Sequence, residues 1–233
     1  MRRRDMMLAA AGVAVAQGAA LPALAQQQRP AQPRPAQPQP RPPAAPPSTP
    51  ASSPLGPVDT AARQAILLDF ETGAVLLEKN PDERMPPSSM SKLMTMYVVF
   101  DMLKAGRLRL DQTLPVSERA WRMGGSKMFV DLGAQVSVEN LARGVIVQSG
   151  NDACIVLAEG ISGSEQQFAE LMNETGRRIG LRASHFRNST GWPDPEQRMT
   201  ARDLAVLARR MIVDHPEYYR FYNERSFRWN DIS

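Results

Sequence analysis

The sequence predicts an α+β fold that is mainly helical, with a small strand component near the start of its folded part. Two short apolar runs, 65–69 and 74–78, flank a turn that contains Gly73 and predict a β-hairpin. Further along the chain, apolar residues recur at helical spacing behind Ser and Thr residues of the kind that cap helices. No internal repeat is visible, so we expect one folded domain over residues 58–233.

Residues 1–25 predict an export signal. A positive start at Arg2, Arg3 and Arg4 precedes a short apolar run, and the small residues of 23–25 fit a cleavage site before Gln26. The apolar run is short for a bilayer span. We therefore expect cleavage and a periplasmic or other extracytoplasmic location, and membrane association is not evident from the sequence.

Residues 26–57 predict a disordered linker rich in proline. Twelve of the chain's 20 prolines fall between Pro30 and Pro57. Such a segment has few apolar side chains to bury, so folding cannot offset its conformational entropy. An extended tether is the expected form, and a ligand for a proline-binding domain is the alternative.

Charge and composition exclude several classes of function. The net charge is +4, but the first 57 residues hold six arginines and a single acid, while the remainder holds 22 basic and 23 acidic residues. The folded part is not basic, so nucleic acid is not an expected partner. One cysteine, Cys154, and two histidines argue against a disulfide framework and a metal site, and we expect no cofactor.

The helical segments follow from local signals. Residues 93–103 are apolar around nearly their whole circumference, which predicts a helix that is buried on all sides. Ser164 with Gln167 forms a capping box before a helix that Gly180 ends. Thr200 opens another helix, and Ser137 opens a third that runs to about residue 147.

The first candidate for chemistry is a serine one helical turn before a lysine. Of the four lysines, Lys92 alone completes a Ser-x-x-Lys pattern, with Ser89. At this spacing the two side chains share a helix face, and a buried amine loses its proton more readily. A neutral amine beside a hydroxyl can act as its base. A capping serine and a surface lysine, matched by chance, are the alternative.

The second candidate is Ser149-Gly150-Asn151, on a turn between two helical runs. A serine and an asparagine here can present a hydroxyl and an amide to a shared cleft. The alternative is that Ser149 or Asn151 merely caps the next helix. Finding both pairs in this order favours a catalytic site.

These motifs and their surroundings resemble one family. The chain is similar to the serine-type D-alanyl-D-alanine carboxypeptidases, the low-molecular-mass penicillin-binding proteins of bacterial cell-wall metabolism. The resemblance runs from about residue 62 to residue 233. The stretches that carry it are 87–95, 124–129, 148–154, 185–186 and 200–204.

The resemblance implies a β-lactamase/transpeptidase-like fold and a role for each candidate. Ser89 is similar to the acylated nucleophile, and Lys92 is similar to the general base. Ser149 resembles the serine that relays the proton, and Asn151 resembles the asparagine that contacts the substrate backbone and orients the lysine. The implied substrate is a peptidoglycan stem peptide ending in D-Ala-D-Ala, which loses its last D-alanine through an acyl-serine. β-Lactams would acylate the same serine.

One motif of the family has no match in this sequence. None of the four lysines is followed by Thr-Gly or Ser-Gly, and in relatives the Lys-Thr-Gly motif falls beyond the point where this chain stops. We therefore expect 58–233 to be a partial domain with an incomplete antiparallel sheet. A missing oxyanion-hole donor typically costs on the order of 10²–10³ in rate. The alternatives are a catalytically dead peptidoglycan-binding envelope protein or a gene fragment. A β-lactamase is weaker, because its usual Ser-Asp-Asn is Ser-Gly-Asn here.

Overall fold

The structure is a computed structural model that describes residues 49–230. The export signal and most of the proline-rich linker lie outside the described residues. Residues 49–57 correct the linker's predicted end. Ala51 is buried and pairs with Val58, and Ser52 exchanges two backbone hydrogen bonds with Glu78, of 2.8 and 2.9 Å. This segment is ordered because its backbone groups find partners at the edge of the first sheet.

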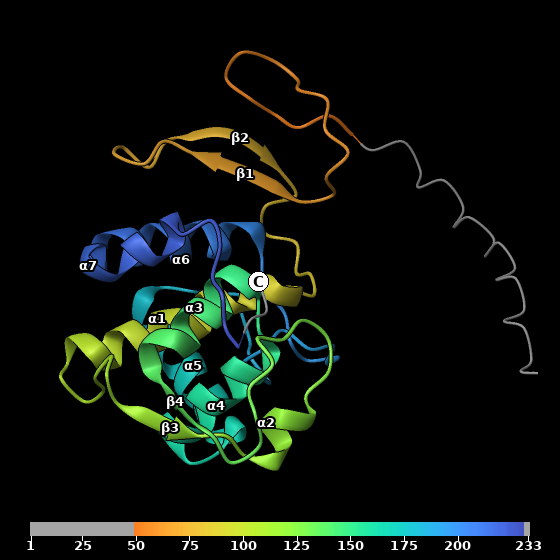
Figure 1. Cartoon of the computed structure of the whole chain (residues 1–233). Coiled ribbons are helices and arrows are strands. Elements are labelled where there is room, and N and C mark those ends of the chain that lie inside the picture. The colour runs from red at the N-terminus through yellow and green to blue at the C-terminus, as the bar shows by residue number, and fades with distance from the viewer. Residues whose placement is uncertain (1–48, 231–233) are drawn as a thin grey trace, which may run out of the picture. The chain divides into compact units, whose positions relative to one another are not determined.

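The predicted hairpin is confirmed. Strand β1 (Ala65–Leu68) pairs antiparallel with β2 (Val75–Lys79), with Ala65 opposite Lys79. Gly73 has a φ of 74°, as the turn requires. Figure 1 shows the hairpin as a two-stranded layer beside α6 (Ala201–Asp214), which β1 contacts.

Helix α1 (Lys92–Lys104) lies at the centre of the helical part. It contacts α3 (Val138–Gln148), α4 (Asn151–Ser162), α5 (Glu165–Ile179) and α6 (Figure 1). The predicted burial on all sides is confirmed, because neighbouring helices cover nearly every face. Its buried side chains are Lys92, Met94, Thr95, Met96, Tyr97, Val98, Val99, Phe100 and Leu103.

The predicted helix caps are also confirmed. The side-chain oxygens of Ser137, Ser164 and Thr200 accept hydrogen bonds from the backbone N–H three residues on, at 3.3, 3.2 and 3.0 Å. Gly180 ends α5 in the left-handed region. The serines and Thr200 thus set where α3, α5 and α6 begin.

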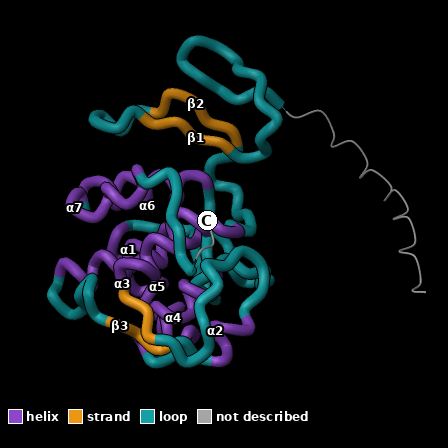
Figure 2. Tube along the Cα trace, viewed as in Figure 1, coloured by secondary structure: helices purple, strands orange, loops and turns teal. Residues whose placement is uncertain are grey.

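Several short elements were not predicted. Strands β3 (Thr113–Pro115) and β4 (Gln135–Ser137) form a second antiparallel pair, and Figure 2 shows that strands are few beside the helices. Helices α2 (Glu118–Arg122) and α7 (Pro216–Tyr219) are also short, as are the 3₁₀ turns η1 (Ser88–Ser91) and η2 (Arg220–Asn223). Elements of three to five residues give too little periodicity to be recognised. The α+β class is confirmed. Within residues 49–230, no helix is long and apolar enough to cross a membrane.

Candidate active site

Ser89 and Lys92 lie on the turn that enters α1. The sequence predicts that Ser89 and Lys92 share the face of one helix, but the structure places Ser89 in η1 and begins α1 at Lys92. Ser88 accommodates the tighter turn with a φ of 48°. Ser89 Oγ and Lys92 Nζ are 3.0 Å apart, within hydrogen-bonding distance. The i, i+3 spacing therefore brings the two groups together in a 3₁₀ turn, where side chains three apart are nearly eclipsed.

The Lys92 amine is enclosed by protein. Lys92 is 6% exposed, and its Nζ donates a hydrogen bond of 2.7 Å to the carbonyl oxygen of Thr190. Desolvation by burial lowers the pKa of Lys92 below its ordinary value, and the nearby Cys154 thiol acts in the opposite direction. A buried amine with a lowered pKa can take a proton from a neighbouring hydroxyl.

Ser149 points toward Ser89; it ends α3 as its C-cap and does not cap α4, the helix that follows. It follows α3 in the left-handed region, with φ 56° and ψ 33°. Its Oγ donates a hydrogen bond of 3.2 Å to Ser89 Oγ, while the residue that precedes α4 as its N-cap is Gly150. A left-handed backbone is costly for a residue other than glycine, and such positions cluster at functional sites. The capping alternative for Ser149 is wrong.

Asn151 lies two residues further on, at the start of α4. It is 6% exposed, and its Nδ2 donates to the carbonyl oxygen of Gly124 at 2.9 Å. Its backbone N–H donates to the carbonyl oxygen of Ser126 at 2.8 Å. In the described part of the chain, the hydrogen bonds of Asn151 reach this loop and not Lys92. Asn151 therefore fixes the loop at 124–126 against the helix that follows Ser149.

Asp152 is a site residue that the sequence reasoning missed. It is fully buried, and its carboxylate oxygens accept hydrogen bonds from the backbone N–H groups of residues 128, 129, 130 and 153, at 2.8 to 3.2 Å. The carboxylate fastens the 128–130 segment to the first turn of α4. An acidic residue in the first turn of a predicted helix was the signal available.

The loop that carries Thr190 was also missed. Thr190 contributes a backbone atom, so no pattern of side chains identifies it as the partner of Lys92. The available signal was Asn188-Ser189-Thr190-Gly191, a run of residues that favour loops. The preceding carbonyl, of Ser189, accepts a hydrogen bond of 2.6 Å from Thr95 Oγ1 on α1. The loop is therefore fastened to α1 at two successive carbonyls.

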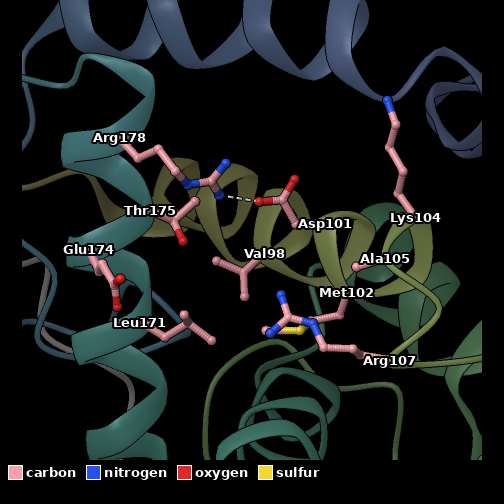
Figure 3. A pocket seen from close by; sticks show the side chains of 10 residues that line it. All are labelled: Val98, Asp101, Met102, Lys104, Ala105, Arg107, Leu171, Glu174, Thr175 and Arg178. Atoms are coloured by element: carbon pink, nitrogen blue, oxygen red, sulfur yellow. Dashed lines mark hydrogen bonds and ion pairs between the residues drawn. The ribbon is translucent and has the colours of Figure 1, made fainter.

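The catalytic candidates open into a small pocket. Ser89, Lys92 and Ser149 line a space of about 130 Å³ together with Leu93, Met96, Val145, Ile146 and Tyr222. A larger pocket, of about 470 Å³, lies between the carboxyl-terminal half of α1 and α5 (Figure 3). It is lined by Asp101, Arg178 and other side chains, but by none of the four candidate residues. The serine and lysine pair places the candidate active site in the smaller pocket.

Cys154, His185 and Lys127 are each held by neighbouring parts of the fold. Cys154 is buried on α4, and burial raises the pKa of its thiol to about 12. The backbone of His185 pairs with that of Arg198, and Lys127 donates to the carbonyl oxygen of Trp121 at 2.6 Å. Within residues 49–230, no group of three or more His, Cys, Asp or Glu side chains is placed to hold a metal ion.

A serine held against a buried lysine in a helical domain is the arrangement found in a class of serine enzymes that transfer acyl groups. A family model for D-alanyl-D-alanine carboxypeptidase, peptidase S11, matches residues 48–233. The chain therefore belongs to this family of serine peptidases, and the resemblance stated from the sequence is confirmed.

Individual relatives agree with this assignment. D-alanyl-D-alanine carboxypeptidase DacA of Haemophilus influenzae is 43% identical over 179 residues, which is 76% of this chain and 46% of the relative. DacC of Escherichia coli is 44% identical over 73% of this chain and 44% of the relative. The chain thus spans less than half the length of these curated relatives.

A solved structure supports the fold. Penicillin-binding protein 5 from Haemophilus influenzae superimposes with a TM-score of 0.74 at 43% identity, covering 76% of this chain and 52% of that one. The expected β-lactamase/transpeptidase-like fold is therefore confirmed for the part of the chain that aligns.

Proposed function

We propose that this protein is a serine D-alanyl-D-alanine carboxypeptidase. Its substrate is a peptidoglycan stem peptide ending in D-Ala-D-Ala, and its product lacks the terminal D-alanine. Family membership supports the reaction class. The observation that carries the proposal is the 3.0 Å contact between Ser89 Oγ and the buried Lys92 amine.

Ser89 is the proposed nucleophile and Lys92 the proposed base. The neutral amine takes the hydroxyl proton as Ser89 Oγ attacks the carbonyl carbon between the two D-alanines. A tetrahedral intermediate forms and then collapses with cleavage of the C–N bond. The acyl group remains on Ser89 as an ester, and D-alanine leaves.

Ser149 is the proposed relay for the leaving amine. Its hydroxyl lies 3.2 Å from Ser89 Oγ, which itself lies 3.0 Å from Lys92 Nζ, and this grouping supports a role in passing the proton from Lys92 to the departing nitrogen. Water then attacks the ester, and its proton returns by the same route, which releases the shortened peptide and restores Ser89. Asn151 is the proposed contact for the substrate backbone, supported by the family resemblance and by its place two residues after Ser149, where Gly124 holds its side chain at 2.9 Å.

β-Lactams are the proposed covalent inhibitors, acylating Ser89 at the same position. One relative, penicillin-binding protein D2 from Listeria monocytogenes, was solved in an ampicillin-bound form and shares 26% identity with a TM-score of 0.65. The lactam carbonyl is attacked as the peptide carbonyl is, but the leaving nitrogen stays tethered to the acyl group.

Labelling with a fluorescent penicillin tests this function. The folded chain should carry one label, and mass spectrometry should place it on Ser89. Ser89→Ala should abolish the label. Ser88→Ala is the matched control, because Ser88 lies next to the nucleophile and also precedes Lys92 within one turn. Label that survives Ser89→Ala would contradict the assignment.

A second measurement separates the enzyme from the non-catalytic alternative. Incubation with a peptide ending in D-Ala-D-Ala should release D-alanine, detected by a D-amino-acid oxidase assay. A protein that binds purified cell-wall sacculi, but shows neither penicillin label nor D-alanine release, would instead be a peptidoglycan-binding envelope protein.

The proposed location is the periplasm, after cleavage of the export signal. The arginine-rich start and apolar run of residues 1–25 support it. Amino-terminal sequencing of the protein recovered from the periplasmic fraction should begin at Gln26. Recovery of the uncleaved chain from the cytoplasm would contradict this.

A further inference from the structure

The loop at residues 188–192 is organised by one side chain, that of Asn188. Its Oδ1 accepts hydrogen bonds from the backbone N–H groups of Thr190, Gly191 and Trp192, at 3.2, 2.8 and 3.1 Å. Its Nδ2 donates to the carbonyl oxygen of Trp192 at 3.0 Å. The two ends of one amide thus close the loop on itself and fix the direction of the Thr190 carbonyl.

The loop is also pressed against the turn that carries the nucleophile. Gly191 has a φ of 85°, and a Cβ at this position would lie 1.9 Å from the carbonyl oxygen of Ser88. On the other side, the buried carboxylate of Glu165 accepts hydrogen bonds from the backbone N–H and the hydroxyl of Ser189, at 3.0 and 2.7 Å. The loop therefore has little freedom to move relative to Ser89.

We propose that Asn188 is a positioning residue for the Lys92 base, an inference that rests on the proposed function. A neutral amine has two N–H bonds and one lone pair. When one N–H donates to the Thr190 carbonyl, 2.7 Å away, the lone pair can face Ser89 Oγ, 3.0 Å away. After proton transfer the ammonium keeps the same hydrogen bond. Asn188 acts by holding that carbonyl in place, and it does not itself touch the reacting atoms.

The test is the rate of penicillin acylation in variants of Asn188. Asn188→Ala removes the acceptor, and Asn188→Gln moves it by one methylene while keeping the amide. Both should slow acylation on the order of 10²-fold, the cost of misplacing a catalytic group by about 1 Å. The penicillin concentration at half saturation should stay unchanged. Asn188→Asp should retain most of the rate, because a carboxylate oxygen can accept the same three N–H bonds.

Asn173→Ala is the matched control. The Asn173 amide bridges backbone groups of Ala169 and Phe186, at 2.7 to 2.9 Å, and so fastens the start of the same segment without reaching Thr190. It should lower the unfolding midpoint and leave the acylation rate near that of the wild type. Equal slowing in Asn173→Ala, or wild-type rates in both Asn188→Ala and Asn188→Gln, would overturn the proposal.

Labelling of the wild type separates this inference from the proposed function. If the wild type is not labelled at Ser89, the proposed function fails. The positioning of Lys92 is then judged from crystal structures of the wild type and Asn188→Gln. Displacement of the Thr190 carbonyl from Lys92 Nζ in the variant supports the inference, and an unchanged contact overturns it.

Discussion

The carbonyl oxygen of Thr190 accepts a hydrogen bond of 2.7 Å from Lys92 Nζ, although 98 positions separate the two residues. The contact joins the loop that precedes α6 to the first residue of α1. The hydrogen bond orients the Lys92 amine, while desolvation lowers the pKa of that amine. Both effects favour a lysine that can act as a base toward Ser89.

The first prediction concerns pH. Burial lowers the pKa of Lys92 from its ordinary 10.5, so the amine becomes neutral at a lower pH than a free lysine does. The rate of penicillin acylation should therefore rise with pH along a limb whose midpoint lies below 10.5. Lys92→Arg, which stays charged, should lower the rate on the order of 10²–10⁴-fold. Rapid-mixing kinetics across the neutral and alkaline range measure both effects, and a pH-independent wild-type rate would contradict the assignment.

The second prediction concerns Gly191. In Gly191→Ala the new methyl group meets the Ser88 carbonyl in a backbone conformation that alanine rarely adopts. The positive φ alone costs about 1–3 kcal/mol, and the clash adds to it. We expect a large loss of stability in urea denaturation and loss of penicillin labelling.

Gly180→Ala is the control for that experiment. Gly180 has a φ of 94°, but no atom lies within 4 Å of the position of its added Cβ. It should show the cost of the backbone conformation without the clash and keep the penicillin label. Equal effects of the two substitutions would mean that contact with the turn of Ser89 is unimportant.

The third prediction concerns the two buried aspartates that begin helices. Asp152 accepts hydrogen bonds from four backbone N–H groups beside the site. Asp203, at the start of α6, accepts hydrogen bonds of 2.7 to 3.1 Å from the backbone N–H groups of Arg182 and Ala183 and from the hydroxyl of Ser184. Replacement by asparagine removes charge and one acceptor atom. Each variant should lose about 1.5–3 kcal/mol in denaturant unfolding.

Acylation should distinguish the two variants. Asp152→Asn loosens the 128–130 segment, which adjoins the loop held by Asn151, so penicillin acylation should slow. Asp203→Asn should acylate at the wild-type rate at a temperature where it is folded. Slower acylation in Asp203→Asn alone would show that the 128–130 segment does not support the site.

Local signals explain how much of this could be predicted from the sequence. The Ser89 and Lys92 contact spans three residues, and the caps at Ser137, Ser164 and Thr200 act over the same distance, so each could be anticipated. The partner of Lys92 at Thr190 could not, because it is a backbone atom placed by the tertiary fold. The direction of Ser149 toward Ser89 depends in the same way on how α3 packs beside α1.

At the larger pocket, Asp101 joins the exposed Arg178 and the buried His215 in one network. Asp101 receives a hydrogen bond from Arg178, drawn in Figure 3, and its other oxygen lies 3.2 Å from Nε2 of the buried His215. Burial acts to raise the pKa of Asp101, but its contacts with His215 and Arg178 outweigh it and hold the pKa below its ordinary value. The network links α1, α5 and the end of α6, away from Ser89.

The last prediction follows from that lowered pKa. A carboxyl group whose pKa is lower in the folded state than in the unfolded state stabilises the fold at pH values above its ordinary pKa of 3.8. This stabilisation disappears as the pH falls through the lowered pKa of the folded state. Asp101→Asn should therefore cost about 1–3 kcal/mol at neutral pH. The difference in unfolding free energy between the variant and the wild type should shrink in acid.

Asp111→Asn is the control. The Asp111 carboxylate pairs with Arg109 on the open surface, where both side chains are 73% exposed, so its loss should cause no measurable change in stability. Urea denaturation at neutral and acidic pH would contradict the assignment if the Asp101→Asn difference were independent of pH.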